Sequence, residues 1–152
     1  MKQFEFRLQK VMETTRAREE LQKKELAMAL AELDRNETQL EQMLDHLEQE
    51  VEQFAGRRKK GSMKVSTLVQ YASYTDNLLS EIDRQRRDIE KLARLADEQR
   101  DKLIEITRDK KILEKLKEKR FAEYRRKLRQ VEQKFMDEIS SRSFDNGMKE
   151  TN

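Results

Sequence analysis

Apolar residues recur at steps of three and four along the first third of the chain, which is the spacing of one face of an α-helix. Sustained over several turns, this spacing predicts a heptad seam, the apolar face along which one helix packs on another. The predicted seam positions are Leu26, Leu30, Leu33, Leu40, Leu44, Leu47, Val51 and Phe54. Glu37 is the one polar interruption. We therefore expect a helix over about residues 3–55.

Upstream of this seam, the apolar spacing continues in a phase that is one residue out of step. Phe4, Leu8, Val11 and Thr15 carry it. A shift of phase within one helix requires an inserted residue, called a stutter, and we expect it between about residues 15 and 26.

A basic segment with a glycine near each end, Gly56–Ser62, separates this helix from the next. The chain has no proline and only three glycines, so few other places favour a helix end. Gly56 stands where a helix C′ residue would, and we expect a loop over about residues 56–62. Ser62 and Ser66 are both candidate N-caps for the next helix, and Thr67 with Gln70 resembles a capping box.

A second seam follows and predicts a helix over about residues 63–141, with a slip near Gln99 and a disordered tail over about residues 142–152. Its positions are Leu68, Ala72, Thr75, Leu79, Ile82, Arg86, Ile89, Ala93, Ala96, Leu103, Ile106, Leu113, Phe121, Tyr124, Leu128, Val131 and Phe135.

The two seams match as an antiparallel pair, because facing residue numbers add up to a nearly constant value. Leu40 with Ile82 gives 122, and Leu44 with Leu79 gives 123. The same rule sets Glu37 opposite Arg86, an opposite-charge pair expected to fix the register. The fold class is therefore all-α: residues 1–152 form a single antiparallel coiled-coil hairpin of two long helices.

Continued outward, the register sets Leu8 near Leu113 and Phe4 near Lys117, where the first helix runs out. The second helix then overhangs from about residue 118 to 140. Its apolar positions keep the seam spacing at Phe121, Tyr124, Leu128, Val131 and Phe135. Burial of each large side chain stabilises by about 1.5–3 kcal/mol, so we expect this overhang to dock on another molecule.

The composition fits long paired helices, because 43% of the residues are charged and only 35% are hydrophobic. Such a chain cannot enclose a thick core. It has no cysteine, which excludes disulfides and thiolate metal sites. It also lacks a signal-peptide pattern and an apolar run of about 20 residues, so we expect a cytoplasmic protein.

Charge is distributed unevenly along the chain. Nine acidic residues and one basic residue lie between Glu25 and Glu52, whereas eleven basic and four acidic residues lie between Thr107 and Arg129. The basic loop and this second cluster allow binding to nucleic acid or an acidic membrane. Interspersed acidic residues and a spread around the helix make nucleic acid the less favoured partner.

Candidate chemistry is sparse, and we expect no catalytic residue, metal site, cofactor or small-molecule substrate. His46 is the one histidine, at an outward heptad position, and is expected to be solvated. Tyr71 and Tyr74 lie near the loop and off the predicted seam. They are either partner contacts or packed along the shoulder of the seam.

Three stretches, Phe4–Val11, Asp109–Leu116 and Glu132–Glu138, resemble the FliJ family of small coiled-coil proteins of bacterial flagellar type III export. Tyr71 and the region from Leu78 to Ile82 are similar to the family's second-helix opening. The resemblance implies a non-enzymatic stalk, peripheral to the inner membrane at the flagellar base. It would bind the hexameric export ATPase with the end that carries both termini, and elsewhere the membrane-embedded export gate and export chaperones.

The resemblance also implies roles for particular residues. The ATPase-binding set is Phe4, Leu8, Phe121, Tyr124, Arg125, Leu128, Val131 and Phe135. The gate-binding set is Tyr71, Tyr74, Leu78 and Gln85. Three alternatives stay open: an injectisome stalk homologue, a basic coiled-coil binder of nucleic acid or acidic membrane, and a structural coiled coil whose overhangs pair in a dimer. We expect a monomer or weak dimer.

Overall fold

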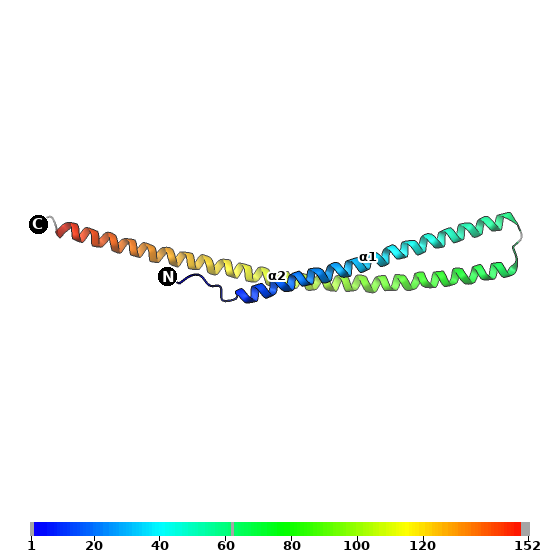
Figure 1. The fold of residues 1–152 in the computed structure, drawn as a ribbon, viewed down its shortest axis with the longest axis horizontal. Helices are drawn as coiled ribbons and strands as arrows, with labels where there is room; N and C mark the ends of the chain where they lie inside the picture. Colours follow the sequence, from blue (N-terminus) through cyan, green and yellow to red (C-terminus); the bar gives the residue numbers. More distant parts are fainter. Residues whose placement is uncertain (1, 62, 150–152) are drawn as a thin grey trace. The chain divides into compact units, whose positions relative to one another are not determined.

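The computed structural model describes residues 2–61 and 63–149, and most of these residues lie in two long helices (Figure 1). Helix α1 spans Gln9–Lys60, 52 residues, and helix α2 spans Val65–Lys149, 85 residues. The described part of the chain contains no strand. The predicted all-α fold of two long helices in a hairpin is confirmed.

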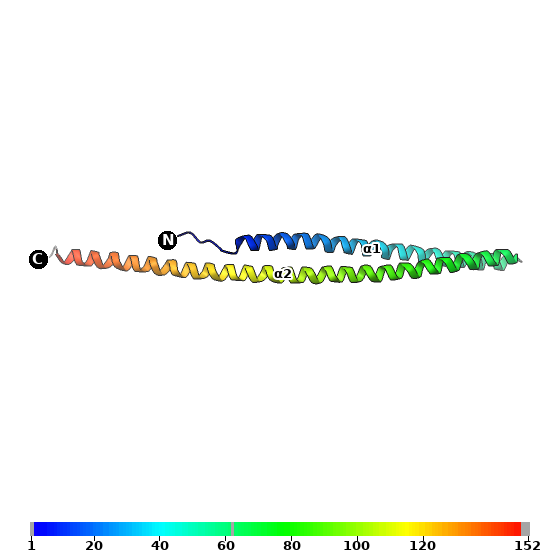
Figure 2. The same ribbon diagram turned by 90° about the horizontal axis from the view of Figure 1, so that it is seen from below.

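The chain divides into two compact units, each built from one segment of α1 and one of α2. The hairpin unit comprises Glu19–Glu105, and the terminal unit comprises Met1–Arg18 with Ile106–Asn152. In each unit the two segments run antiparallel, as the chain colours in Figure 1 and the turned view in Figure 2 both show.

The seam of the hairpin unit contains half of the predicted positions. Leu33, Leu40 and Leu47 are half-buried on α1, and Ile82 is only 2% exposed on α2. The other half lies one residue earlier on each helix: Ala29, Asn36 and Met43 replace Leu30, Glu37 and Leu44, and Tyr71, Leu78 and Gln85 replace Ala72, Leu79 and Arg86. An apolar seam can advance by three residues and then four, or by four and then three, and both patterns fit a heptad repeat. Only packing against the partner helix determines which of the two patterns is used.

The polar layer of the hairpin unit is an amide pair. The Gln85 side-chain amide donates to the Asn36 side-chain oxygen at 3.0 Å and to the Asn36 carbonyl at 3.1 Å. The predicted charge pair lies one residue away on each helix, where Glu37 and Arg86 are exposed and Arg86 contacts Asp83 at 3.9 Å. The expected polar layer is therefore present, but it consists of the Asn36 and Gln85 amides rather than the charges of Glu37 and Arg86.

A second amide pair explains why the predicted phase shifts are wrong. Gln22 donates to the Gln99 side-chain oxygen at 2.6 Å and to its carbonyl at 3.0 Å. Burial continues in strict heptad steps through Met12, Thr15 and Glu19. No stutter is needed before residue 26 and no slip at Gln99, because polar side chains occupy seam positions in the regular phase. Val11, predicted in the seam, is exposed.

The ends of α1 differ from the prediction on both sides. The helix begins at Gln9 rather than near residue 3, and the Gln9 N–H donates to the Phe6 carbonyl at 2.9 Å. At its other end it continues through Gly56, which does not have a positive φ, to Lys60. A glycine inside a helix costs about 1 kcal/mol. Four basic residues in the last turn each contribute about 0.3–1 kcal/mol with the helix dipole, enough to offset that cost.

The ends of α2 also lie outside the predicted range. The N–H groups of Thr67 and Leu68 donate to the Lys64 carbonyl, so Ser66 and Thr67 lie inside the first turn and are not N-caps. Ser62 lies outside the described residues. The helix continues to Lys149, where a disordered tail was expected from about residue 142.

Candidate docking surface of the terminal unit

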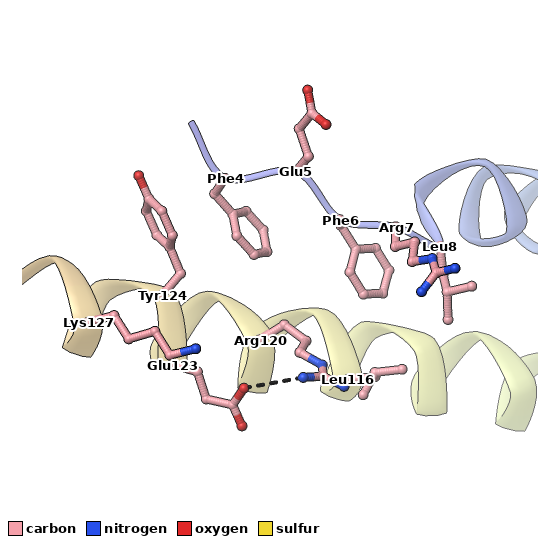
Figure 3. A pocket seen from close by; sticks show the side chains of 10 residues that line it. All are labelled: Phe4, Glu5, Phe6, Arg7, Leu8, Leu116, Arg120, Glu123, Tyr124 and Lys127. Atoms are coloured by element: carbon pink, nitrogen blue, oxygen red, sulfur yellow. Dashed lines mark hydrogen bonds and ion pairs between the residues drawn. The ribbon is translucent and has the colours of Figure 1, made fainter. Parts of the chain in front are cut away.

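Residues Lys2–Leu8, here called the N-terminal strap, precede α1 and lie along α2. Phe4 and Phe6 point toward α2 and Glu5 points away from it (Figure 3). This alternation is the two-residue period of an extended chain. It also lengthens the reach of the strap, because an extended residue advances about 3.3 Å and a helical one about 1.5 Å.

The strap ends in an aromatic cluster. The Phe4 ring lies 5.2 Å from the Phe121 ring and 5.5 Å from the Tyr124 ring, between ring centres. The Tyr124 hydroxyl donates to the Lys2 carbonyl at 3.1 Å. These distances lie within the range for favourable aromatic pairs. Phe4, Phe121 and Tyr124, three residues of the predicted ATPase-binding set, thus come together inside one chain.

The cluster corrects the predicted outer register. Phe4 was expected near Lys117, but the Lys117 ammonium instead donates to the Gln9 side-chain oxygen at 2.8 Å. Phe4 lies one helical turn further along α2, beside Phe121, because the strap is extended rather than helical. The overhang of α2 therefore begins later than residue 118, beyond the reach of the strap.

A groove of about 710 Å³ runs between the strap and α2 (Figure 3). Apolar side chains of both segments line it, namely Phe4, Phe6, Leu8, Leu116 and Tyr124. Its charged lining residues are three basic ones, Arg7, Arg120 and Lys127, and two acidic ones, Glu5 and Glu123, and Arg120 contacts Glu123 at 3.5 Å. Phe6, Leu116, Arg120 and Lys127 are lining residues that the sequence analysis did not single out.

Beyond the strap, α2 carries an exposed apolar row, here called the C-terminal stripe: Leu128, Val131, Phe135 and Ile139. Val131 is 52% exposed, Phe135 61% and Ile139 47%, whereas Leu128 is half-buried. Ile139 extends the predicted row by one turn and could have been found from the same spacing. A row of this kind with basic neighbours is typical of a docking surface.

Charges around the stripe change sign along α2. Arg125, Arg126, Lys127 and Arg129 are exposed at its start. Near its end, Glu138 accepts from Arg142 at 2.7 Å, within one helix. The start of the stripe therefore favours an acidic neighbour, and its end does not.

The predicted gate-binding residues lie in the hairpin unit, and three of them contribute to helix pairing. Tyr71 stacks on Phe54 with ring centres 3.7 Å apart, Leu78 is 7% exposed, and Gln85 binds Asn36. Only Tyr74 is largely exposed. For Tyr71 the interpretation as a residue packed along the seam describes its position.

His46 is exposed, as expected for a solvated residue, and its ring nitrogen also lies 2.6 Å from the Tyr74 hydroxyl. The two rings meet edge to face, with centres 6.2 Å apart. This contact joins α1 to α2 outside the seam. No sequence pattern predicts the contact between His46 and Tyr74, because the residue of α2 that lies opposite His46 depends on the register of the two helices.

Lys23 on α1 lies beside two carboxylates that favour its charged form. The pKa of Lys23 is raised above its ordinary value of 10.5, first by the hydrogen bond to Glu19 and then by that to Glu20. The ammonium lies 3.0 Å and 3.1 Å from the two carboxylates. This triad lies on one helix of the hairpin unit and stabilises it locally.

The described residues were also compared with the requirements of metal and membrane sites. Among them, no three histidine, aspartate or glutamate side chains form a group that could hold a metal ion. No helix in the same part of the chain combines the length and apolarity that a membrane span requires.

Comparison with known proteins gives one family. The family model described as "Flagellar FliJ protein" matches residues 4–149. No curated protein and no solved structure gives a significant match. The matched range includes the strap from Phe4 onward, both helices and the C-terminal stripe, and the chain therefore belongs to the FliJ family of flagellar proteins.

Proposed function

We propose that this chain is a stalk of the flagellar export apparatus and that its terminal unit docks on the hexameric export ATPase. The family supports a structural component of flagellar protein export rather than an enzyme. Its function then depends on which surfaces bind other export proteins.

The observation that carries the proposal is the C-terminal stripe. Val131, Phe135 and Ile139 are each about half exposed or more, although they continue a heptad spacing that is buried elsewhere. Covering a large apolar side chain stabilises by about 1.5–3 kcal/mol when burial is complete. Three such residues on one face, next to the half-buried Leu128, would contribute to the binding of a partner helix or loop.

The basic residues at the start of the stripe would then select the partner's charge. Arg125 is exposed, and its neighbours on α2 are mostly basic. Long-range attraction of this kind accelerates association and weakens as salt screens it. An ATPase surface with acidic side chains around an apolar contact would fit.

The export gate and the export chaperones are proposed partners of the hairpin unit. Tyr74 is the predicted gate residue with the largest free surface, and the His46 contact fixes its hydroxyl. Leu78 and Gln85 would act indirectly, because they hold the helix pair that presents Tyr74. Placement beside the inner membrane at the flagellar base follows from these partners.

The direct test is binding to the export ATPase of the same bacterium, measured by calorimetry with purified proteins. The variant Val131→Glu with Phe135→Glu places two charges on the stripe at exposed positions, so the helix should still form. We expect at least a tenfold loss of affinity. The matched control, Met28→Glu with Val69→Glu, alters two exposed apolar residues of the hairpin unit and should bind as the wild type does.

Equal affinity of the stripe variant and the control would refute docking through the stripe. Binding that instead depends on Tyr74→Ala would move the ATPase contact to the hairpin unit. Circular dichroism of each variant shows whether helix content is retained.

A further inference from the structure

The apolar row on α2 has a property that ATPase docking does not require: its spacing is nearly the same in both chain directions. The row consists of Phe121, Tyr124, Leu128, Val131, Phe135 and Ile139. Its centre lies midway between Leu128 and Val131. A second copy of α2, lying antiparallel, would therefore present the same row in register.

We propose that the C-terminal stripe is also a self-association surface, on which α2 of a second copy pairs antiparallel. In that pairing Leu128 faces Val131 of the other copy, and Tyr124 faces its Phe135. The facing residue numbers add up to 259 in both layers. The pairing goes beyond the proposed function and does not depend on it.

Each of these layers combines side chains that suit one another. Tyr124 with Phe135 is an aromatic pair, and it occurs twice because the pair of copies is symmetric. The Tyr124 ring is half-buried and also lies 5.5 Å from the Phe4 ring of its own chain. Leu128 with Val131 is an aliphatic pair at the centre. Val131 and Phe135 are exposed in the single chain, so the pairing covers surface that is otherwise in contact with water.

Charge favours the antiparallel direction. From Lys117 to Arg129 there are seven basic and two acidic residues, and from Gln130 to Ile139 there are one basic and three acidic. An antiparallel second copy lays the basic half of each helix along the acidic half of the other. A parallel copy would set the two basic halves side by side, which costs free energy.

The flanks of the row show which charges meet. Arg125 of one copy and Glu132 of the other share one flank, an attractive pair that occurs twice. Lys127 and Lys134 share the other flank and repel. The association is therefore weak, because these two pairs oppose one another.

The pairing would use side chains that the ATPase would also cover. A copy bound to another copy through Val131 and Phe135 cannot offer them to a third protein. Self-association and ATPase docking are then mutually exclusive, and the exposed row of the free protein is covered in either state.

The experiment measures the mass of the full-length protein alone by analytical ultracentrifugation over a range of concentrations. The weight-average mass should rise from 18.4 kDa toward twice that value. The Val131→Glu with Phe135→Glu variant should stay at the monomer mass. The control, Met28→Glu with Val69→Glu, should associate as the wild type does.

Cysteine crosslinking tests the direction. The chain has no native cysteine, so Tyr124→Cys and Phe135→Cys can be made singly. An equal mixture of the two should form a disulfide-linked dimer under mild oxidation. Neither variant should crosslink with itself, because identical residues lie eleven positions apart along the pair, which is about 16 Å on a helix.

Three results would overturn the proposal. The first is a monomer mass at every concentration up to the solubility limit. The second is crosslinking of either single-cysteine variant with itself, which would indicate a parallel pair. The third is a dimer that persists in the Val131→Glu with Phe135→Glu variant, as expected if basic α2 binds the acidic Glu25–Glu52 segment of another copy. None of these results bears on ATPase binding, which is measured separately.

Discussion

Replacing the Asn36–Gln85 amide pair with leucine should show whether the hairpin unit gains specificity or stability from it. The Gln85 side-chain amide donates across the seam to the Asn36 side-chain oxygen at 3.0 Å and to the Asn36 backbone carbonyl at 3.1 Å. In Asn36→Leu the backbone carbonyl remains but the Gln85 amide loses its side-chain acceptor, at a cost of about 1–3 kcal/mol. A half-buried leucine returns only about 1 kcal/mol. Each single variant should therefore be less stable than the wild type by about 1 kcal/mol.

The double variant, Asn36→Leu with Gln85→Leu, should behave differently, because no unpaired amide is left. Two half-buried leucines together contribute about 2 kcal/mol. Replacing both partners of a buried hydrogen bond by apolar groups is close to neutral. The double variant should thus be about 1–2 kcal/mol more stable than the wild type. The two single effects would then fail to add by roughly 3 kcal/mol.

Urea unfolding of the four proteins, followed by circular dichroism, measures this coupling. The matched control is the cycle Glu37→Leu with Arg86→Leu, one residue away on each helix, where both side chains are exposed. Its effects should add to within about 0.5 kcal/mol. Additive effects at Asn36 and Gln85, or strong coupling at Glu37 and Arg86, would refute the amide register.

Four further predictions follow from other contacts. Cysteines replacing Leu40 and Ile82, which are half-buried and buried in the seam, should crosslink within one chain, and only dimer bands on a gel would contradict the hairpin. Phe4→Ala removes two aromatic contacts, each worth about 0.5–1.5 kcal/mol, so limited proteolysis near the strap should accelerate roughly tenfold; unchanged cleavage would show that the strap is not docked. Tyr74→Phe should cost about 0.5–1.5 kcal/mol of unfolding free energy, because the His46 contact is lost, and a neutral result would count against that contact. The folded-state pKa of Lys23 is raised, so its charged side chain stabilises the fold below pH 10.5, and this stabilisation is lost as the pH rises above that value. The difference in unfolding free energy between the wild type and Lys23→Met should therefore be largest below pH 10.5 and disappear above it. A constant difference from pH 8 to pH 12 would show that the effect does not come from the charge of Lys23.

The two-helix fold could be predicted from the sequence because leucines dominate one heptad position. Leu26, Leu33, Leu40 and Leu47 recur every seven residues, and all are half-buried in the structure. The second heptad position could not be assigned. Leu30 is larger than Ala29, and Leu44 is more apolar than Met43. Both leucines nevertheless lie outside the seam. The fit to α2, rather than the hydrophobicity of the residue, determines which of the two neighbouring positions lies in the seam.

The polar part of the seam was the hardest to predict from the sequence. Thr15, Glu19 and Gln22 occupy buried or half-buried positions, although their side chains are typical of a solvated face. Their spacing from Met12 and Leu26 was regular. If only apolar residues are counted as seam positions, the sequence predicts a stutter where the heptad repeat is in fact continuous.

The strap did leave a signal in the sequence. Phe4, Phe6 and Leu8 alternate with Glu5 and Arg7, which is a period of two rather than three or four. A helix would place Phe4 and Phe6 on different faces, whereas an extended chain presents both to α2 (Figure 3). The helix start at Gln9 follows from that alternation.

The two amide layers are fourteen residues apart on each helix, from Gln22 to Asn36 and from Gln85 to Gln99. If one helix slid by a single heptad, Asn36 would face Leu92 or Leu78, and both amide pairs would be broken at once. A slide by two heptads would restore one amide layer but not the other: Gln85 would face Glu50, or Asn36 would face Tyr71. Every neighbouring alignment of the two helices therefore leaves amides without their partners.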